Sequence, residues 1–564
     1  MRKLSLIMLV ALLTALLAAC GESSSGGGGG TNPPANAVVV KMLYGSEKQA
    51  WMEAVTPAFN QQQNKTASGK PIFIDAVPAG SADSMERALN GAGAEEPVVW
   101  SPASSILIPV ANDRWAQTNN GAIFVDDAPP LVLSPVVIAM WRPMAEALGW
   151  PNTPLGWGDI AELASSGKSW ADFGHPEWGA FQFGHTHPDF SNSGITSILA
   201  TAYAATGKTR GLTLADVQKP ETATFLGNVE KNIIHYGEST GFFGRQMFNR
   251  GPAYLSAAVL YENLVVESYD TARYPNRSLP VVAIYPKEGT FWADNPYTIV
   301  NAPWVSAEER EAATTFRDYL LATAQQLQAL QFGFRPADPS IAIGAPIVIE
   351  NGVDPKQPST LLEVPNVEVI KAIRALWGQN KKRVDVQVVL DISGSMNEEE
   401  RMVRAKEALK LFIGQLADQD RLGITVFSTD ARELTPLDEL GPKRADVLSR
   451  VDGLFASGNT RLIDTVKEAY EQMQQLPSDE RIRALVVLSD GDDNRSTTTA
   501  DQITQLMQVD EEGRSIKVFT IAYGSGISEA KKLLEDIATA SGARSYVSDT
   551  VEIQQIYRDI ATFF

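Results

Sequence analysis

One stretch of the chain, Val384 to Met396, joins an apolar run to a cluster of polar side chains. Four valines and a leucine precede Asp391, and such a β-branched run is typical of a parallel strand covered on both faces. Ser393 and Ser395 follow the carboxylate at a spacing of two. Hard oxygen ligands on one loop suit a hard divalent cation such as Mg²⁺. The stretch therefore predicts a buried strand that ends in a metal-binding loop.

The residues after this loop predict a helix with Asn397 as its N-cap, because Glu400 stands three residues later as in a capping box. The buried face of the helix is marked by apolar residues at spacings of three and four: Met402, Ala405, Leu409, Phe412 and Leu416. Further strands are predicted at 422–427, 431–434, 483–489, 516–523 and 544–547, and further helices at 444–454, 462–473, 529–540 and 551–563. This alternation predicts an α/β, doubly wound, Rossmann-like sheet with the metal loops at one edge.

The motif DISGS, Asp391 to Ser395, resembles the DxSxS signature of von Willebrand factor A domains, and the resemblance covers residues 383–564. In that family the signature forms a metal-ion-dependent adhesion site with a later threonine and a later aspartate, which Thr460 and Asp490 match in context. The resemblance implies hydroxyl ligands from Ser393, Ser395 and Thr460, and carboxylate ligands, direct or through water, from Asp391 and Asp490. It implies Mg²⁺, or another divalent cation such as Ca²⁺ or Mn²⁺. One coordination position is expected to stay open for a carboxylate of a partner protein.

Coordination rather than catalysis is expected in this half of the chain. Residues 383–564 contain neither histidine nor cysteine, so a Ser-His-Asp or Cys-His arrangement is excluded there. A metal-assisted hydrolase that used Asp391 and Asp490 would lack an evident general base. We therefore expect a protein that is not an enzyme. One departure from the usual family pattern, Gly458-Asn459 where two glycines are common, bears on loop shape and not on the ligand set.

The N-terminal residues predict a secreted, lipid-anchored protein. Arg2 and Lys3 precede an apolar run that is shorter than the ~20 residues of a membrane span and ends at Leu17-Ala18-Ala19-Cys20. This ending resembles the lipobox of bacterial lipoproteins, which implies removal of residues 1–19 and a diacylglycerol on Cys20. An ordinary signal peptide with an incidental cysteine is the alternative. Residues 20–36, mostly Gly, Ser and Pro, predict a flexible tether that holds an extracytoplasmic domain, in the periplasm or at the cell surface, away from a membrane.

Residues 37–378 predict a second α/β unit, in keeping with a length of 564 residues that suggests several domains. Short apolar strands at 37–43, 72–77 and 98–100 alternate with helical stretches. A longer apolar segment, 129–141, could run from one lobe to another, and a further apolar run follows much later, at 280–286. Such a path makes two lobes with a cleft between them. A short polar segment, 378–383, is the predicted domain boundary.

Several weak motifs in this unit resemble, by their order, bacterial extracellular solute-binding proteins in the branch near the molybdate-binding type. They cover about residues 38–350 and are TPAFNQQ, WSPASS, ALGWP with GWGDIAELA, FGHTHPDFSNSG and YPKEGTFW. The resemblance implies a two-lobed, periplasmic-binding-protein-like fold with a small-molecule solute between the lobes. By position in the resembled fold, the candidate contacts are Ser46, Ser101, Ser105, Ser134, Ser191 and Ser193. Tyr261 could line the cleft, and Ser191, Asn192 or Ser193 could cap the following helix.

Two remaining features restrict the partners. His185 and His187 stand two apart and could ligate zinc, but no third ligand is evident, so hydrogen-bonded histidines are expected. The formal charge of −19 argues against nucleic acid, since phosphate binding needs clustered Lys and Arg. The sequence thus predicts a lipid-anchored extracytoplasmic protein that binds a solute and, through a metal, a partner protein. The alternative is the receptor of an ABC-type uptake system, with the C-terminal module as its docking domain.

Overall fold

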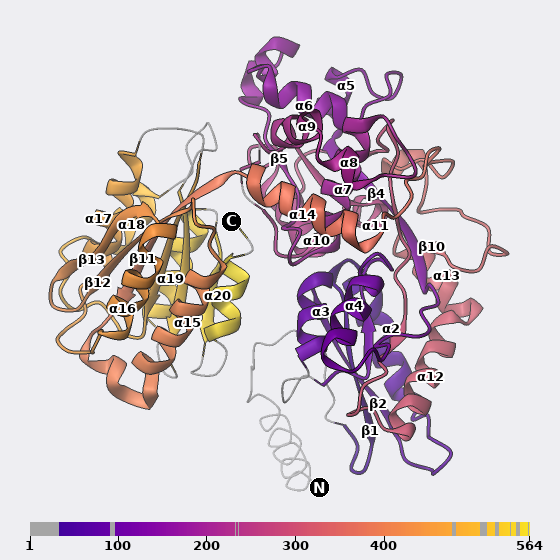
Figure 1. Cartoon of the computed structure of the whole chain (residues 1–564), viewed down its shortest axis with the longest axis horizontal. Coiled ribbons are helices and arrows are strands. Elements are labelled where there is room, and N and C mark those ends of the chain that lie inside the picture. Colours follow the sequence, from indigo (N-terminus) through magenta and orange to yellow (C-terminus); the bar gives the residue numbers. More distant parts are fainter. Residues whose placement is uncertain are drawn as a thin grey trace, which may run out of the picture.

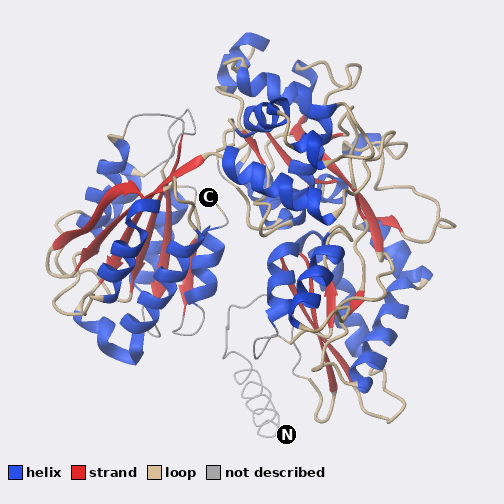
Figure 2. Cartoon of the chain, in the orientation of Figure 1, coloured by secondary structure: helices blue, strands red, loops and turns tan. Residues whose placement is uncertain are grey.

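The computed structural model describes residues 33–90, 96–231, 233–234, 236–476, 481–507, 516–524, 529–541, 543–548, 553–561 and 563. The predicted signal segment, Cys20 and most of the predicted tether lie outside the described residues. The described chain forms two lobes and a C-terminal α/β domain (Figures 1 and 2). Within those ranges, no helix combines the length and the apolar character that a membrane crossing requires.

The first lobe is built on a four-stranded sheet in the order β2-β1-β3-β9. Strand β1 pairs in parallel with β2 and β3, while β9 closes the edge in the antiparallel sense. The elements of this lobe are β1 (Val38–Gly45), α2 (Gln49–Gln61), β2 (Ile72–Ala79), α3 (Ser81–Asn90), β3 (Val99–Ser101), α4 (Leu107–Thr118), β9 (Thr298–Ile299), α12 (Ala307–Leu321) and α13 (Thr323–Gln331).

The second lobe is organised around the long strand β4, which pairs with β6, β7, β8 and β10. Its elements are β4 (Val132–Trp141), α5 (Arg142–Ala147), α6 (Trp157–Ser165), β5 (Phe183–Gly184), α7 (Asn192–Thr206), α8 (Leu214–Val217), α9 (Pro220–Glu230), α10 (Thr240–Arg250), β6 (Ala257–Tyr261), α11 (Glu262–Glu267), β7 (Val281–Ile284), β8 (Trp292–Ala293), β10 (Arg335–Pro336) and α14 (Val367–Asn380). Leu131 and Val132 belong to the core of the first lobe, whereas Val136 to Trp141 belong to the core of the second. The apolar segment therefore runs between lobes, as the sequence predicts.

The two lobes touch through hydrogen bonds from the start of α3, from α10 and from α11. The backbone N–H groups of Ala82 and Asp83 donate to the carbonyl of Phe190, at 3.1 and 3.0 Å. Gly241 N donates to Ser46 Oγ at 3.1 Å. Asn263 Nδ2 donates to the carbonyl of Glu47 at 3.1 Å. These bonds hold the lobes together in this structure.

The C-terminal domain has a six-stranded sheet in the order β13-β12-β11-β14-β15-β16. All neighbours are parallel except β13, which is antiparallel to β12. Its elements are β11 (Arg383–Asp391), α15 (Arg401–Gln415), β12 (Arg421–Phe427), β13 (Ala431–Glu439), α16 (Arg444–Asp452), α17 (Leu462–Gln474), β14 (Arg481–Ser489), α18 (Ala500–Leu506), β15 (Lys517–Tyr523), α19 (Glu529–Ala540), β16 (Ser545–Ser548) and α20 (Ile553–Ala561).

Both faces of this sheet are covered, which explains the apolar run of β11. Val386 and Val388 pack in one core with residues of α15 and α20, while Val389 packs in another with residues of α17 and α19. The alternation follows from the period of two along a strand. A doubly wound α/β sheet results, as predicted.

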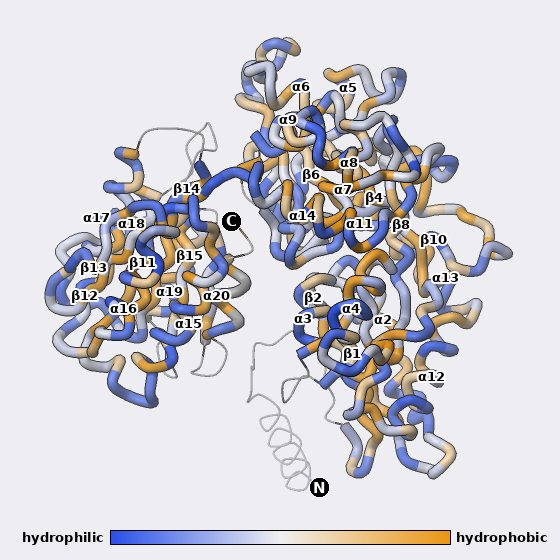
Figure 3. The backbone as a smooth tube through the Cα atoms, viewed as in Figure 1, coloured by the Kyte–Doolittle hydropathy of each residue, from blue (hydrophilic) through white to orange (hydrophobic). Residues whose placement is uncertain are grey.

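A short link between α14 and β11 joins the two domains, and Figure 3 shows this link as hydrophilic. The domains also contact each other at a junction next to the link. Arg544 Nη1 donates to Glu238 Oε2 at 3.1 Å. Tyr236 N donates to the carbonyl of Phe563 at 3.3 Å. A cavity of about 320 Å³ lies at the junction, lined by residues of both domains that include Phe190, Trp377 and Leu416. One set of buried apolar residues continues from the second lobe into the C-terminal domain.

Candidate metal centre and solute site

The predicted metal loop begins where two neighbouring parallel strands end. Asp391 ends β11, and Asp490 follows Ser489 at the end of β14. Ser489 Oγ donates to Asp391 Oδ2 at 2.5 Å, and Ser393 N donates to Asp391 Oδ1 at 2.8 Å. Burial raises the pKa of Asp391 to about 6, although the hydrogen bonds from Ser489 and Ser393 oppose that shift. The carboxylate is therefore held in place at the buried end of the sheet.

The hydroxyls converge on the second carboxylate. Ser395 Oγ donates to Asp490 Oδ1 at 2.7 Å, and the hydroxyl oxygens of Ser393 and Ser395 lie 3.0 Å apart. A Cβ atom added to Gly491 would lie 3.5 Å from Thr460 Oγ1 and 3.6 Å from Ser395 Oγ. The structure thus brings together all five side chains that the sequence proposes as ligands.

Backbone hydrogen bonds fix the Thr460 loop against the first loop. Gly394 N donates to the carbonyl of Gly458 at 3.0 Å, and Ser457 N donates to the carbonyl of Ile392 at 2.7 Å. Gly458 has a φ of +90°, a conformation that L side chains rarely adopt. The next residue, Asn459, is anchored by its N–H on Thr429 Oγ1 at 3.1 Å. A single glycine therefore suffices for this turn.

The predicted N-cap at Asn397 is wrong. Residues 394–400 form a 3₁₀ segment with a break, and α15 begins only at Arg401. Asn397 Nδ2 instead donates to the carbonyl of Ala456 at 3.1 Å, which joins the two loops. Arg401 lies beside the cluster, with Nη1 3.0 Å from Asp490 Oδ2. Sequence reasoning missed this residue because a lone arginine at a helix start carries no signal.

The donor set suits a hard cation, since it offers three hydroxyls and two carboxylates on converging loops. In the described part of the chain, no group of three or more His, Cys, Asp or Glu side chains is placed to hold a metal ion. A cation at this site would therefore depend on the serine and threonine oxygens together with Asp391 and Asp490.

The predicted solute contacts fall into two groups at the lobe interface. Ser191 Oγ lies 3.1 Å from Thr240 Oγ1, and Thr240 Oγ1 donates to Ser193 Oγ at 2.8 Å. Ser191 is the N-cap residue of α7, but its side chain makes no capping bond because it pairs with Thr240. Asn192 Nδ2 donates to Tyr261 Oη at 2.9 Å. These residues form one buried polar cluster.

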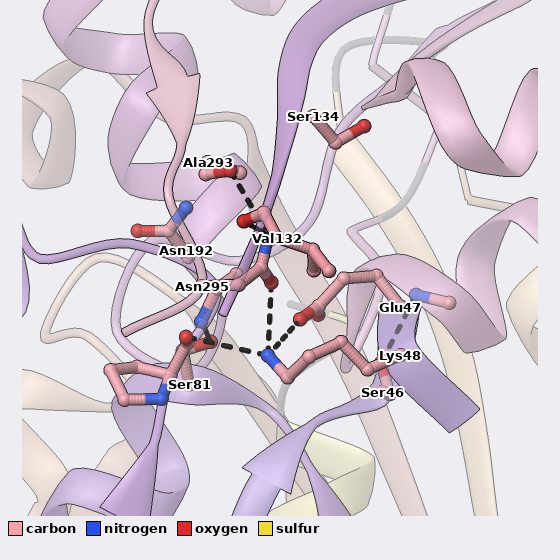
Figure 4. Close-up of polar contacts among 12 residues, drawn as sticks. Ser46, Glu47, Lys48, Ser81, Val132, Ser134, Asn192, Ala293 and Asn295 are labelled. Carbon is pink, nitrogen blue, oxygen red and sulfur yellow. Dashed lines mark hydrogen bonds and ion pairs between the residues drawn. The ribbon is translucent and has the colours of Figure 1, made fainter. Parts of the chain in front are cut away.

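The second group lies where β1 ends and β4 begins. Ser134 Oγ donates to Asn263 Oδ1 at 3.0 Å, and Asn263 in turn bonds to the carbonyl of Glu47. Lys48, which is 0% exposed, donates to Glu47 Oε1 at 2.7 Å and to Asn295 Oδ1 at 2.9 Å (Figure 4). Sequence reasoning selected Ser46 here but missed the adjacent buried Glu47–Lys48 pair. The signal was the same for all three residues, because they directly follow the end of β1.

The remaining predicted contacts, Ser101 and Ser105, differ in their hydrogen bonding, and Asn192 shares a feature with Ser101. Ser101 is buried at the end of β3, and its Oγ atom has no hydrogen-bond partner among the described residues. Asn192 Oδ1 is also buried without a partner there. Ser105 is half-buried and uses its backbone N–H on Asp294 Oδ1 at 2.7 Å. A buried polar atom without a hydrogen-bond partner costs free energy, so a solute that bonded to Ser101 Oγ or Asn192 Oδ1 would remove that cost.

The two histidines do not form a pair. His185 Nε2 lies 3.0 Å from Glu230 Oε1, and its Nδ1 lies 2.7 Å from the carbonyl of Thr186. His187 Nδ1 accepts from Asp189 N at 3.2 Å, and its ring packs edge-on against Trp377. Their different partners agree with the expectation of hydrogen-bonded histidines.

Comparison with known proteins assigns the two halves. The sequence model described as "Bacterial extracellular solute-binding protein" matches residues 40–335, more than half of the chain. The chain belongs to this family. The von Willebrand factor type A (VWA) domain model matches residues 385–559, so this solute-binding protein carries a C-terminal VWA domain. The first half implies a small-molecule ligand and suggests an extracytoplasmic location.

Individual relatives match one half or the other. The Escherichia coli (strain K12) protein described as "Uncharacterized protein YfbK" is 24% identical over 168 residues, which are 30% of this chain and 29% of YfbK. This chain therefore spans less than a third of that relative. A solved von Willebrand factor type A structure from Catenulispora acidiphila is 24% identical, with TM-score 0.29, over 32% of this chain and 43% of that one. A periplasmic thiamin binding protein is 12% identical, with TM-score 0.43, over 61% of this chain and 96% of that one.

Proposed function

We propose that this protein is a lipid-anchored extracytoplasmic receptor that binds a solute between its lobes and a partner protein through a divalent cation on its VWA domain. The observation that carries the metal part is the hydrogen-bonded cluster that links Asp391, Ser395 and Asp490 across two strand ends. When bound there, the cation would supply a Lewis-acidic position for a carboxylate of the partner. The residues Ser393, Ser395, Thr460, Asp391 and Asp490 would hold and orient it.

Calorimetric titration of the chain with Mg²⁺, Mn²⁺ and Ca²⁺ tests this site. We expect one site per chain, and we expect the Ser393→Ala/Ser395→Ala variant to lose it, because two of three hydroxyl ligands are gone. The control is Ser449→Ala, at an exposed serine in α16 that is not among the proposed ligands. Metal binding that is unchanged in the double variant would refute the assignment.

The solute part rests on the family and on two buried polar atoms without partners, Ser101 Oγ and Asn192 Oδ1. A thermal-shift screen with oxyanions, sugars and amino acids identifies the solute class, since a ligand at 100 times its Kd adds about 2.7 kcal/mol to stability. The Asn192→Ala variant should lose the shift given by the true solute. A shift that persists in this variant would place the solute elsewhere.

Anchoring is proposed through Cys20, which follows the Leu-Ala-Ala motif. The wild-type protein should sediment with bacterial membranes and take up labelled fatty acid, whereas Cys20→Ser should do neither. Equal membrane association of the two would contradict a lipid anchor.

The family of the N-terminal half also favours a second candidate, the receptor of an ABC-type uptake system with the VWA domain as its docking module. Deletion of the gene would then abolish uptake of the solute found in the screen. Uptake that is unchanged in the deletion strain would leave only the binding receptor.

A further inference from the structure

A buried arginine stands beside the candidate metal centre. Arg401 is the first residue of α15 and is 6% exposed. Its guanidinium donates from Nη1 to Asp490 Oδ2 at 3.0 Å and from Nη2 to Glu399 Oε2 at 3.1 Å. A cation at a helix N-terminus opposes the helix dipole, so this placement depends on the carboxylates around it.

The surrounding backbone leaves room for this guanidinium. Gly524, at the end of β15, has a φ of +106°, and a Cβ atom there would lie 2.9 Å from Arg401 Cζ and 3.0 Å from Nε. Glu399 and Glu400, just before the helix, both have positive φ values, of 50° and 59°. Such conformations are unfavourable for non-glycine residues and persist only where the surroundings impose them. The arginine is therefore built into the end of the sheet.

The two carboxylates of the site differ because of Arg401. Asp391 is held by uncharged donors, the Ser489 hydroxyl and the Ser393 N–H. Asp490 instead gives Oδ2 to a fixed positive charge, and only Oδ1 remains for Ser395 or for a cation. Bidentate carboxylates are common ligands of Ca²⁺, whereas Mg²⁺ takes single oxygens and keeps several waters. The arginine's charge also repels a divalent cation at contact range.

We propose that Arg401 determines the metal affinity and selectivity of this site: it keeps Asp490 monodentate, disfavours Ca²⁺ relative to Mg²⁺, and lowers the affinity for both ions. Arg401 also neutralises Asp490 when no metal is bound, so the loops stay assembled in the metal-free protein. The proposal rests on the proposed metal-binding function. It makes metal binding weak and reversible.

Calorimetric titration of the full chain with Mg²⁺ and with Ca²⁺ tests this role. Arg401→Gln and Arg401→Met both remove the positive charge. The glutamine keeps an N–H donor for Asp490, so Arg401→Gln separates the loss of the charge from the loss of the hydrogen bond. We expect at least tenfold tighter Mg²⁺ binding in either variant, and a larger gain for Ca²⁺, so that the Mg²⁺ preference falls at least threefold. Arg401→Lys keeps the charge and should stay within about threefold of the wild-type Mg²⁺ affinity.

Arg404→Gln is the matched control. Arg404 lies one turn further along α15, is 39% exposed in its side chain and pairs with Glu400 at 3.4 Å, so its loss should leave metal binding unchanged. If Arg401→Gln binds Mg²⁺ with the wild-type affinity and also binds Ca²⁺ with the wild-type affinity, the role of Arg401 is overturned while the metal site stays intact. Absence of metal binding in every variant, the wild type included, would refute the proposed metal site itself. Metal binding in the Arg401 variants but not in the wild type would overturn the proposed tuning, because the arginine would then exclude the cation altogether.

Discussion

The pH dependence of folding is predicted to include a large contribution from His187. His187 is 6% exposed, and its ring centroid lies 4.8 Å from that of Trp377. Burial lowers the pKa of His187 to about 3, and although Asp189 opposes the shift, Lys381 adds to it. An unfolded histidine titrates near pH 6.5, so the folded and unfolded chains bind protons differently over a wide range.

The sign and size of the effect follow from these two pKa values. Between about pH 6.5 and pH 3 the unfolded chain binds a proton that the folded chain does not, so stability falls as the pH falls. For His187 alone the loss is near zero at pH 7.5 and about 2 kcal/mol at pH 5. It grows further until the pH approaches the folded pKa.

Urea unfolding at pH 7.5 and pH 5 measures this loss. All 11 tryptophans precede residue 383, so tryptophan fluorescence reports the N-terminal half. We expect His187→Gln to be less stable than the wild type at pH 7.5, but to lose about 2 kcal/mol less between the two pH values. His175→Gln, at an exposed histidine stacked on Trp178, is the control. Equal losses in the wild type and in His187→Gln would refute the reasoning.

Two further perturbations test the lobe interface and the metal loop. Lys48→Met leaves the buried Glu47 carboxylate without its ammonium partner, and we expect it to lower the free energy of unfolding by about 3–5 kcal/mol. Glu47→Gln/Lys48→Met should recover most of that loss in urea unfolding followed by tryptophan fluorescence. Equal stability of the two variants would contradict an ion-pair role. Gly458→Ala places a Cβ atom 2.8 Å from Thr429 Oγ1 at a φ of +90°, so the Thr460 loop must shift. We expect the Mg²⁺ affinity measured by calorimetry to fall about tenfold or more, while the unfolding reported by tryptophan fluorescence stays unchanged. A Gly458→Ala variant with the wild-type affinity would show that the loop does not need glycine here.

The parts of the fold that sequence reasoning predicted correctly are those with strong periodicity. The apolar run before Asp391 forms β11 because both faces of its sheet are covered, and the segment at 129–141 contains β4, which links the lobes. Asp391 and Asp490 lie close together because parallel strands end at a common edge, and hydrogen bonds between Gly394 and Gly458 and between Ser457 and Ile392 bring the Thr460 loop to them. Periodicity was enough for the two strands, whereas Thr460 and Asp490 were proposed from the resemblance to von Willebrand factor A domains.

The errors concern side chains whose partners are distant in sequence. Asn397 has the pattern of an N-cap, yet its amide bonds to Ala456, 59 residues away. Ser191, one of three proposed cap residues, does stand at the N-cap of α7, but its hydroxyl pairs with Thr240, 49 residues away, instead of capping the helix. Lys48 and Arg401 look like ordinary surface charges in the sequence, and only the tertiary structure buries them beside carboxylates. Local patterns carry no information about such pairings.

Two backbone segments, 186–190 and 237–241, take part in both the lobe interface and the domain junction. The bridge between Thr186 and Gly237 joins these segments to each other. On one side, Phe190 and Gly241 carry the bonds that close the lobes. On the other side, Glu238 holds Arg544 of the VWA domain, and Phe190 lines the junction cavity. Opening the lobes by hinge rotation would therefore break hydrogen bonds of the same segments that contact the VWA domain. In such a rotation the VWA domain would move with the second lobe, so its position relative to the first lobe would differ between an open and a closed protein.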